Sequence, residues 1–320
     1  MRRKAQRDTN PYPYSDTNKR YLTFDYYLRH RFNKKCAKIP LDAHFSCPNI
    51  DGTRGVGGCI YCLNGSAAVT ATASSIEEQY ADGVAAVSRK WTDFGLIPYL
   101  QSNTCTYDEP DRLRQLYGKC AALPGAVMLA VATRADCLSP KVIQVLREVS
   151  EEIPLIVELG LQTSNDKTAS IINRCHTRRE FEDGYERLRE AGGDISICVH
   201  IINGLPGEGV DDMLETARFT ASLKPHMVKI HLLHVLRGTA LFEMYDSGLY
   251  VPMERDEYIS TVVRQIELMP PETVIARLTG DGVSRDLAAP DWSRRKMSVL
   301  NDIDKMLFAK GTYQGSGFCR

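Results

Sequence analysis

The sequence predicts an α/β fold in which six parallel strands, each followed by a helix, curl into a partial (β/α)6 barrel. Two observations support this prediction. Strand-like and helix-like segments alternate six times after residue 36, as they do in parallel sheets built from βα units. The 320 residues are enough for one α/β barrel, but two units of a closed eight-stranded barrel are missing from the pattern.

The six expected strands are short runs rich in aliphatic residues. They lie at residues 36–43, 95–102, 126–133, 155–163, 195–204 and 227–236. Pro98 weakens the second strand, because proline cannot donate a ladder hydrogen bond. Polar residues follow most of these strands. Since parallel barrels place their sites at the carboxyl ends of the strands, we expect the functional site there.

A helix-like segment follows each strand. These segments lie at residues 74–91, 109–123, 139–152, 177–193, 210–223 and 253–269. Ser139 is placed to cap the third helix, with Pro140 at its first position. A further helix at 294–310 is expected on the barrel exterior or across its open edge. We therefore divide the chain into three parts, which are a basic N-terminal arm (1–35), a core barrel (36–270) and a C-terminal extension (271–320).

The overall charge is balanced, with 40 Lys and Arg against 40 Asp and Glu. The first forty residues are an exception, with eleven basic residues against three Asp. This arm can attract phosphates, but a solvated terminus explains it as well. No apolar segment follows the basic start, and the longest purely apolar stretch, 126–132, is too short to span a membrane. We expect a cytoplasmic protein whose ten cysteines stay reduced, so that a cysteine cluster indicates metal binding or catalysis.

Three cysteines gather in the segment CPNIDGTRGVGGCIYC, residues 47–62. Cys59 and Cys62 have a spacing that lets two thiolates reach one metal centre, and the glycines between Cys47 and Cys59 allow the loop to fold back. A structural zinc site needs four ligands, and His44 is available as a fourth. A four-iron cluster is usually held by four thiolates, so three would leave one iron with an open coordination position.

This loop, together with Tyr61 before the last cysteine and the polar strand ends, resembles the radical S-adenosylmethionine (SAM) superfamily. The resemblance implies a [4Fe-4S] cluster on Cys47, Cys59 and Cys62, whose open iron binds the amino and carboxylate groups of SAM. It also implies reductive cleavage of SAM to a 5'-deoxyadenosyl radical, which abstracts a hydrogen atom from the substrate.

The eleven-residue gap between Cys47 and Cys59 is longer than is usual in the superfamily and is similar to the radical domain of the Elongator catalytic subunit. Further motifs resemble a group of small bacterial proteins of the YhcC/YtqA type. These motifs are ELGLQT, INRCHT, HIINGLPGE, KIHLLHVLRGT, RLTGD and APDW. Two residues next to the expected cofactor depart from the pattern, Cys175 where glycine is expected and Asn203 where an aliphatic residue is usual.

We expect contacts with SAM from eight residues at the strand ends and in the adjoining loops. They are Tyr61, Gln101, Asn103, Glu158, Gln162, Arg174, Gly204 and Lys229. Gln101 and Asn103 occupy the place where relatives bind the amino group, although a helix cap or turn also explains them. Tyr61 could equally be a core residue. Gly204 belongs to a glycine-rich turn that could pass the adenine.

The charged members of this set are the most informative. Arg174 is the candidate for the SAM carboxylate, because a guanidinium binds it bidentately; the alternative is an ion pair with Glu158 or Asp166. Glu158 and Gln162 share a face of one strand, and a buried carboxylate needs a cationic or hydroxyl partner. Lys229 would be costly in a core without a partner. We assign no catalytic residue, and the nearby histidines are more easily explained as core groups.

The resemblance to the Elongator domain, the basic arm and WSRRK at 292–296 suggest an RNA substrate. Proteins of the YtqA type are linked to tRNA wobble-uridine modification, in which a carboxymethylaminomethyl group is processed to an aminomethyl group. The reaction implies an external electron donor such as flavodoxin or ferredoxin. The alternative is a non-catalytic zinc or iron-sulfur module that binds RNA or a protein.

Overall fold

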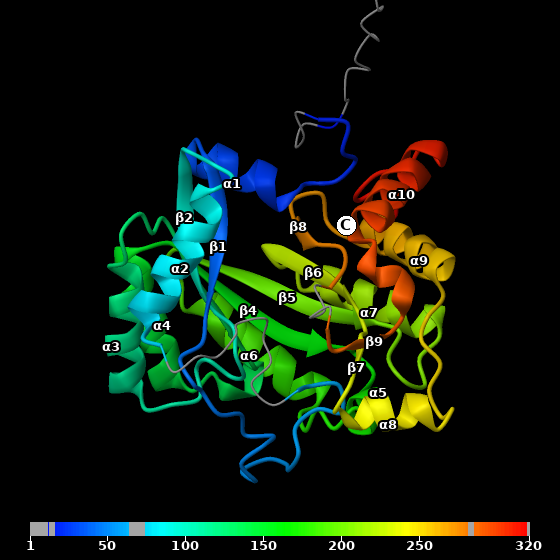
Figure 1. Cartoon of the computed structure of the whole chain (residues 1–320), viewed down its shortest axis with the longest axis horizontal. Helices are drawn as coiled ribbons and strands as arrows, with labels where there is room; N and C mark the ends of the chain where they lie inside the picture. Colours follow the sequence, from blue (N-terminus) through cyan, green and yellow to red (C-terminus); the bar gives the residue numbers. More distant parts are fainter. Residues whose placement is uncertain (1–11, 13–16, 64–73, 281–284, 319–320) are drawn as a thin grey trace, which may run out of the picture.

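The computed structural model describes residues 12, 17–63, 74–280 and 285–318, and its core is one curled parallel sheet (Figure 1). Listed from one edge to the other, the seven strands are β1 Lys35–Leu41, β2 Phe94–Leu100, β3 Leu129–Thr133, β4 Leu155–Gln162, β5 Ile195–Asn203, β6 Met227–Leu232 and β8 Val274–Arg277. All neighbouring strands are parallel. The predicted α/β partial barrel is confirmed, with its six strands in their expected order.

The seventh strand, β8, was not predicted. It has only four residues and lies in the segment that we assigned to the C-terminal extension. It pairs with β6, and its four residues are too few to form an apolar run that a sequence pattern could reveal. Its position extends the curl of the sheet by one strand beyond the predicted six.

The six predicted helices all form, and they cover one face of the sheet. They are α2 Ile76–Ser88, α3 Pro110–Ala121, α4 Pro140–Glu152, α6 Arg178–Glu190, α7 Val210–Ser222 and α9 Arg255–Leu268. Ser139 accepts a hydrogen bond from Val142 N–H and so caps α4 as expected. Helix α10, Lys296–Ala309, packs on α9 and therefore on the barrel exterior. In the described part of the chain no helix is long and apolar enough to cross a membrane.

Three further helices and a small sheet were not predicted, because each is short or lies in a segment without a clear apolar period. The helices are α1 Phe24–Phe32, α5 Asp166–Ile171 and α8 Ala240–Asp246. The small sheet pairs β7 Val235–Leu236 with β9 Leu287–Ala289 in antiparallel orientation. Figure 1 places α5, α8 and this sheet near the carboxyl ends of the central strands.

Helix α1 lies between the two edge strands of the sheet and contacts both β1 and β8. Its Leu28 is buried against residues of the inner face, including Ile97 and Ile156. The segment before it also joins the sheet, since Ile275 N–H donates to Leu22 C=O at 2.8 Å. The described part of the predicted basic arm therefore closes the inner side of the barrel. Residues 1–11 and 13–16 lie outside the described residues, and the division into three parts stays a prediction.

Asn203 at the end of β5 does not lie beside the expected cofactor. It is buried and forms two reciprocal 2.8 Å hydrogen bonds with Gln265 of α9, and Gln265 also donates to Met213 C=O at 3.1 Å. The polar residue at this position is thus satisfied by an amide partner between the sheet and the helical layer.

This amide pair gives a first testable expectation. Replacing Asn203 by Leu should cost about 1–3 kcal/mol in unfolding free energy, because the Gln265 amide is left buried with fewer partners. Replacing both residues by Leu should recover much of that loss. Urea unfolding of the two single variants and the double variant measures the coupling. A double variant as unstable as the sum of the singles would contradict it.

Candidate functional site

A cavity of about 410 Å³ opens within the curl of the sheet. Ten of the eleven residues predicted for the site line it, and they come from the cysteine loop and from β4, β6 and the segments after β2 and α5. They are Cys47, Cys59, Tyr61, Cys62, Gln101, Asn103, Glu158, Gln162, Arg174 and Lys229. Gly204 instead lines a separate cavity of about 370 Å³, together with Tyr250 and Met253. The expectation that Gly204 shares the site with the others is therefore not met.

The three predicted cysteines lie at one end of the cavity, and all three are free thiols. Gly57 and Gly58 have φ of 79° and 76°, in the left-handed region that favours glycine. Gly55 is required for a different reason, since a Cβ there would lie 2.5 Å from Asn49 Oδ1 and 2.6 Å from Cys175 Sγ. The glycines thus allow the loop to fold back from Cys59 to Cys47, as expected.

The long gap between Cys47 and Cys59 forms an exposed turn with its own anchors. Arg54 N–H donates to Pro48 C=O at 2.8 Å. The Arg54 side chain forms an ion pair with Glu180 of α6, and the Thr53 hydroxyl lies 2.8 Å from the hydroxyl of Tyr107. The additional residues therefore make a turn that is fixed to neighbouring elements, while the cysteines at its base remain at the cavity.

Asn49 is a site residue that the sequence analysis missed. It is fully buried, and its Nδ2 lies 3.6 Å from Cys59 Sγ while also donating to Asn173 C=O. Arg174 Nη1 lies 3.9 Å from the same sulfur. A hydrogen bond from Cys62 and the positive charge of Arg174 hold the pKa of Cys59 well below its usual value, although burial opposes this shift. The cysteine end of the cavity thus favours a thiolate.

In the part of the chain that the structure describes, Arg174 forms no ion pair with a carboxylate. Its Nη2 donates to Gly160 C=O at 2.6 Å, and within the described residues it forms no ion pair with Glu158 or Asp166. Gly160 leaves the room for this contact, since a Cβ there would lie 2.9 Å from Arg174 Nη2 and 2.7 Å from Gln162 Nε2. The alternative explanation of Arg174 as a partner of Glu158 or Asp166 is therefore wrong.

Arg134, after β3, holds Arg174 in place and was also missed. It is buried, forms two 2.9 Å hydrogen bonds with the carboxylate of Asp136, and donates to Arg174 C=O at 3.0 Å. The signal in the sequence was the polar segment TRADC at the end of the third strand. Only the fold reveals that this arginine supports the chain at Arg174.

The segments around the cavity supply further polar groups. Asn103 has φ of 60°, and its Nδ2 donates to Phe45 C=O at 2.8 Å, which leaves its Oδ1 as the free acceptor of that side chain. Gln162 has φ of 74° and lies at an irregularity between β4 and β5. Its Oε1 is buried without a hydrogen-bond partner in the described part of the chain. A bound polar ligand would satisfy such an atom.

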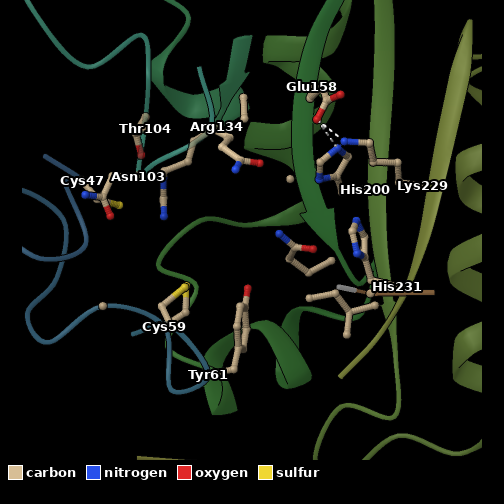
Figure 2. A pocket seen from close by; sticks show the side chains of 18 of the residues that line it. Cys47, Cys59, Tyr61, Asn103, Thr104, Arg134, Glu158, His200, Lys229 and His231 are labelled. Atoms are coloured by element: carbon tan, nitrogen blue, oxygen red, sulfur yellow. Dashed lines mark hydrogen bonds and ion pairs between the residues drawn. The ribbon is translucent and has the colours of Figure 1, made fainter. Parts of the chain in front are cut away.

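Glu158 lies at the opposite end of the cavity from Cys47, in the centre of a polar cluster (Figure 2). It forms ion pairs with Lys38 and Lys229, accepts from the Tyr99 hydroxyl at 2.5 Å, and lies 3.0 Å from His200 Nε2. Burial alone would raise the pKa of Glu158, but the charges of Lys229 and Lys38 outweigh it and hold the pKa well below its usual value. Glu158 thus has two cationic partners, Lys38 and Lys229, where the sequence analysis expected a cationic or hydroxyl partner.

Burial also lowers the pKa values of Lys229 and of the two histidines near Glu158. The pKa of Lys229 is lowered to about 8, because desolvation outweighs the attraction of Glu158. Burial lowers the pKa of His200 to about 4 and that of His231 well below its usual value. The two rings are tilted at 49° with centroids 5.2 Å apart. Both histidines are therefore neutral near pH 7.

A metal ion at this end is not supported. Glu158, Cys198 and His200 place ligand atoms within 4.8 Å of one another. The two lysines already occupy the carboxylate of Glu158, and a cation there would be repelled by them.

Neutral His200 predicts a loss of stability in acid. Its pKa is about 4 in the folded protein against 6.5 when exposed, so the unfolded chain binds more protons between these values. Folding stability should therefore fall as the pH is lowered from 6.5 to 4, and this residue should account for about 3 kcal/mol of the loss. Urea unfolding at several pH values measures the slope. His200→Gln should flatten it, with His30→Gln on the exposed side of α1 as the control; an unchanged slope in His200→Gln would refute the assignment.

The chain is similar to known proteins of one superfamily. A model of the radical SAM superfamily matches residues 51–220, and a model of the radical SAM C-terminal domain matches residues 225–309. The uncharacterized protein YtqA of Bacillus subtilis (strain 168) is 42% identical over 314 residues, which cover 97% of each chain. A tRNA uridine(34) acetyltransferase of Methanocaldococcus jannaschii is 28% identical over 158 residues, 48% of this chain and 28% of that protein.

A solved structure shows the same fold. The archaeal Methanocaldococcus infernus Elp3 with an N-terminal deletion superimposes with a TM-score of 0.66 at 17% identity. The superposition covers 87% of this chain and 64% of that one. Because the superfamily model spans more than half of the chain and YtqA is similar over nearly all of it, this protein belongs to the radical SAM superfamily of enzymes.

Proposed function

We propose that this chain binds one [4Fe-4S] cluster through Cys47, Cys59 and Cys62 and uses it with SAM to start a radical reaction. The main support for this proposal is that these three free thiols lie at one end of a cavity, in a protein of the radical SAM superfamily. Among the described residues no other cysteine lines this cavity. The N–H groups of Asn49 and Arg174 near Cys59 suit an anionic sulfur ligand.

Zinc is less well supported by the same residues. His44, the fourth ligand that the sequence offered, does not line the cavity, and its side chain is 62% exposed beside Asp42. A structural zinc site is normally closed by four protein ligands. Three thiols next to an open cavity fit a metal centre that leaves a position for another molecule.

The chain also offers groups that fit SAM. The Arg174 guanidinium, held by Gly160 C=O and free of any carboxylate in the described residues, suits the carboxylate of the cofactor. Gln101, the Asn103 Oδ1 and the buried Gln162 Oε1 are acceptors for its ammonium and hydroxyl groups. When bound, the cluster and SAM supply a radical that abstracts hydrogen. The protein residues orient the cofactor.

The proposed substrate is a tRNA with a modified wobble uridine. This proposal rests on the similarity to a protein named tRNA uridine(34) acetyltransferase, on the family resemblance of the sequence motifs, and on the basic residues of the first forty positions. The required reaction would process a carboxymethylaminomethyl side chain to an aminomethyl one. An external donor such as flavodoxin or ferredoxin would supply the electron.

Anaerobic purification tests the cofactor assignment. We expect a brown protein with about four irons per chain that releases 5'-deoxyadenosine when it is reduced in the presence of SAM. A colourless zinc protein would support the non-catalytic alternative instead. Nucleoside mass spectrometry of tRNA from a strain lacking the gene tests the substrate, since the carboxymethylaminomethyl nucleoside should accumulate. An unchanged nucleoside profile would direct the search to other substrates.

A further inference from the structure

The cavity has two chemically different ends (Figure 2). The three cysteines and Arg174 lie at one end, which fits the cluster and SAM. The other end, here called the inner end, is formed by Tyr99, Glu158, His200, Lys229, His231 and Arg277. We propose that the inner end binds a carboxylate group of the substrate, with Lys229 and His231 as its two donors. This inference rests on the proposed function, because it takes the cysteine end to be the cofactor site.

The charges at the inner end favour an anion. Glu158 is the single carboxylate that pairs with both Lys38 and Lys229, so this group of three side chains carries one excess positive charge. The side chains of Glu158 and Lys229 are 0% and 5% exposed. A buried charge without compensation is costly, and a ligand with one negative charge would remove the excess. Arg277, a further basic residue, lines the same end.

Two donors remain available after the internal bonds are counted. An ammonium has three N–H groups, and Lys229 uses one on Glu158 and one on the Tyr99 oxygen at 3.3 Å. His231 Nε2 is buried without a hydrogen-bond partner among the described residues. Lys229 and His231 are two positions apart on β6, so their side chains lie on the same face of the sheet. They can each donate to one oxygen of a carboxylate.

The remaining groups exclude a cationic ligand. The carboxylate of Glu158 already accepts from two lysines and a tyrosine. His200 Nε2 lies 3.0 Å from the same carboxylate without forming a well-aligned hydrogen bond, so its ring faces Glu158. Glu158 therefore holds Lys229 in position, and both of its oxygens already pair with groups of the protein.

The shape of the inner end favours a small group. Helix α1 closes the barrel behind it, with Lys38 Nζ 5.2 Å from the centre of the Phe24 ring and Leu28 buried against the inner face. A terminal substituent of a larger substrate can reach Lys229 through the cavity, on the side away from α1. The expected substrate thus carries its carboxylate on the side chain that enters the barrel.

Calorimetric titration of the reconstituted, SAM-bound enzyme with acetate tests the proposal. Acetate should bind to the unaltered protein, and His231→Gln or Lys229→Met should weaken its affinity about tenfold or more, the value of one hydrogen bond to a charged group. Lys141→Met, at an exposed lysine of α4, is the matched control and should bind as the unaltered protein does. Methylammonium, of similar size and opposite charge, should not bind.

Three results would overturn the proposal. They are no acetate binding to the unaltered protein, acetate binding to both variants as tight as to the unaltered protein, and methylammonium binding as tight as that of acetate. His231→Gln keeps the ion pairs of Glu158, so the test does not depend on whether Lys229→Met folds. Release of 5'-deoxyadenosine without substrate is measured on the same samples. Its absence in the unaltered protein contradicts the proposed function, whereas its presence together with unchanged acetate affinity in the variants contradicts only the carboxylate site.

Discussion

Replacing Cys47, Cys59 or Cys62 singly by alanine is expected to remove the iron-sulfur cluster. Iron content should fall from about four per chain to near zero, and release of 5'-deoxyadenosine should be lost with it. The reason is that no other cysteine among the described residues lines the cavity and could replace the missing thiolate. Iron analysis and the visible absorption spectrum of anaerobically reconstituted protein give the measurement.

Two other cysteines serve as controls. Cys175 has its Sγ 3.2 Å from Asn173 Oδ1 and does not line the cavity, and its φ of 55° suits glycine. Cys120 is buried in the core under the helices. Cys175→Gly and Cys120→Ala should keep the cluster. Loss of iron in Cys175→Gly, or full iron in any of the three alanine variants, would show that the ligand set is different.

Glu158→Gln is expected to cause the largest loss of folding stability among single polar substitutions at the site. It leaves Lys38 and Lys229 beside an uncharged side chain, and breaking a buried ion pair from one side costs about 3–5 kcal/mol. Urea unfolding at pH 7 measures the change. The double variant Glu158→Gln with Lys229→Met should regain part of the stability, because one of the uncompensated charges is gone.

An exposed carboxylate provides the matched control for this substitution. Glu148 pairs with Arg114 at 2.8 Å, and their side chains are 39% and 44% exposed. Glu148→Gln should cost less than about 1 kcal/mol, because water screens the pair. Equal effects of Glu148→Gln and Glu158→Gln would mean that the cluster around Glu158 does not stabilise the fold.

The prediction of the fold succeeded where a local pattern is strong. The six predicted strands are rich in aliphatic residues, and some of the predicted helices have a recognisable cap, such as Ser139 before Pro140. The elements that were missed, α1, α5, α8 and β8, have four to nine residues, and short elements carry too few turns or alternations to be recognised. Their positions depend on contacts with distant parts of the chain.

The candidate site also has a part that the sequence predicted and a part that it did not. The spacing of Cys47, Cys59 and Cys62 is local, and the sequence analysis identified these residues directly. The partners of Glu158 are not local, since Lys38 is 120 positions away and Lys229 is 71 positions away. Gly204 was assigned by its motif, but its backbone is held by Tyr250, whose hydroxyl donates to Gly204 C=O at 2.7 Å outside the main cavity.

The sequence by itself therefore determined the class of fold and pointed to the three cysteines proposed as metal ligands, because both depend on neighbours along the chain. The tertiary structure alone decided that Arg174 forms no ion pair with a carboxylate among the described residues, that α1 closes the barrel, and that Lys229 and His231 line a shared space. The physical reason is that the burial of a side chain and the net charge around it depend on residues from many strands. Parallel strands bring these side chains together only when the sheet curls.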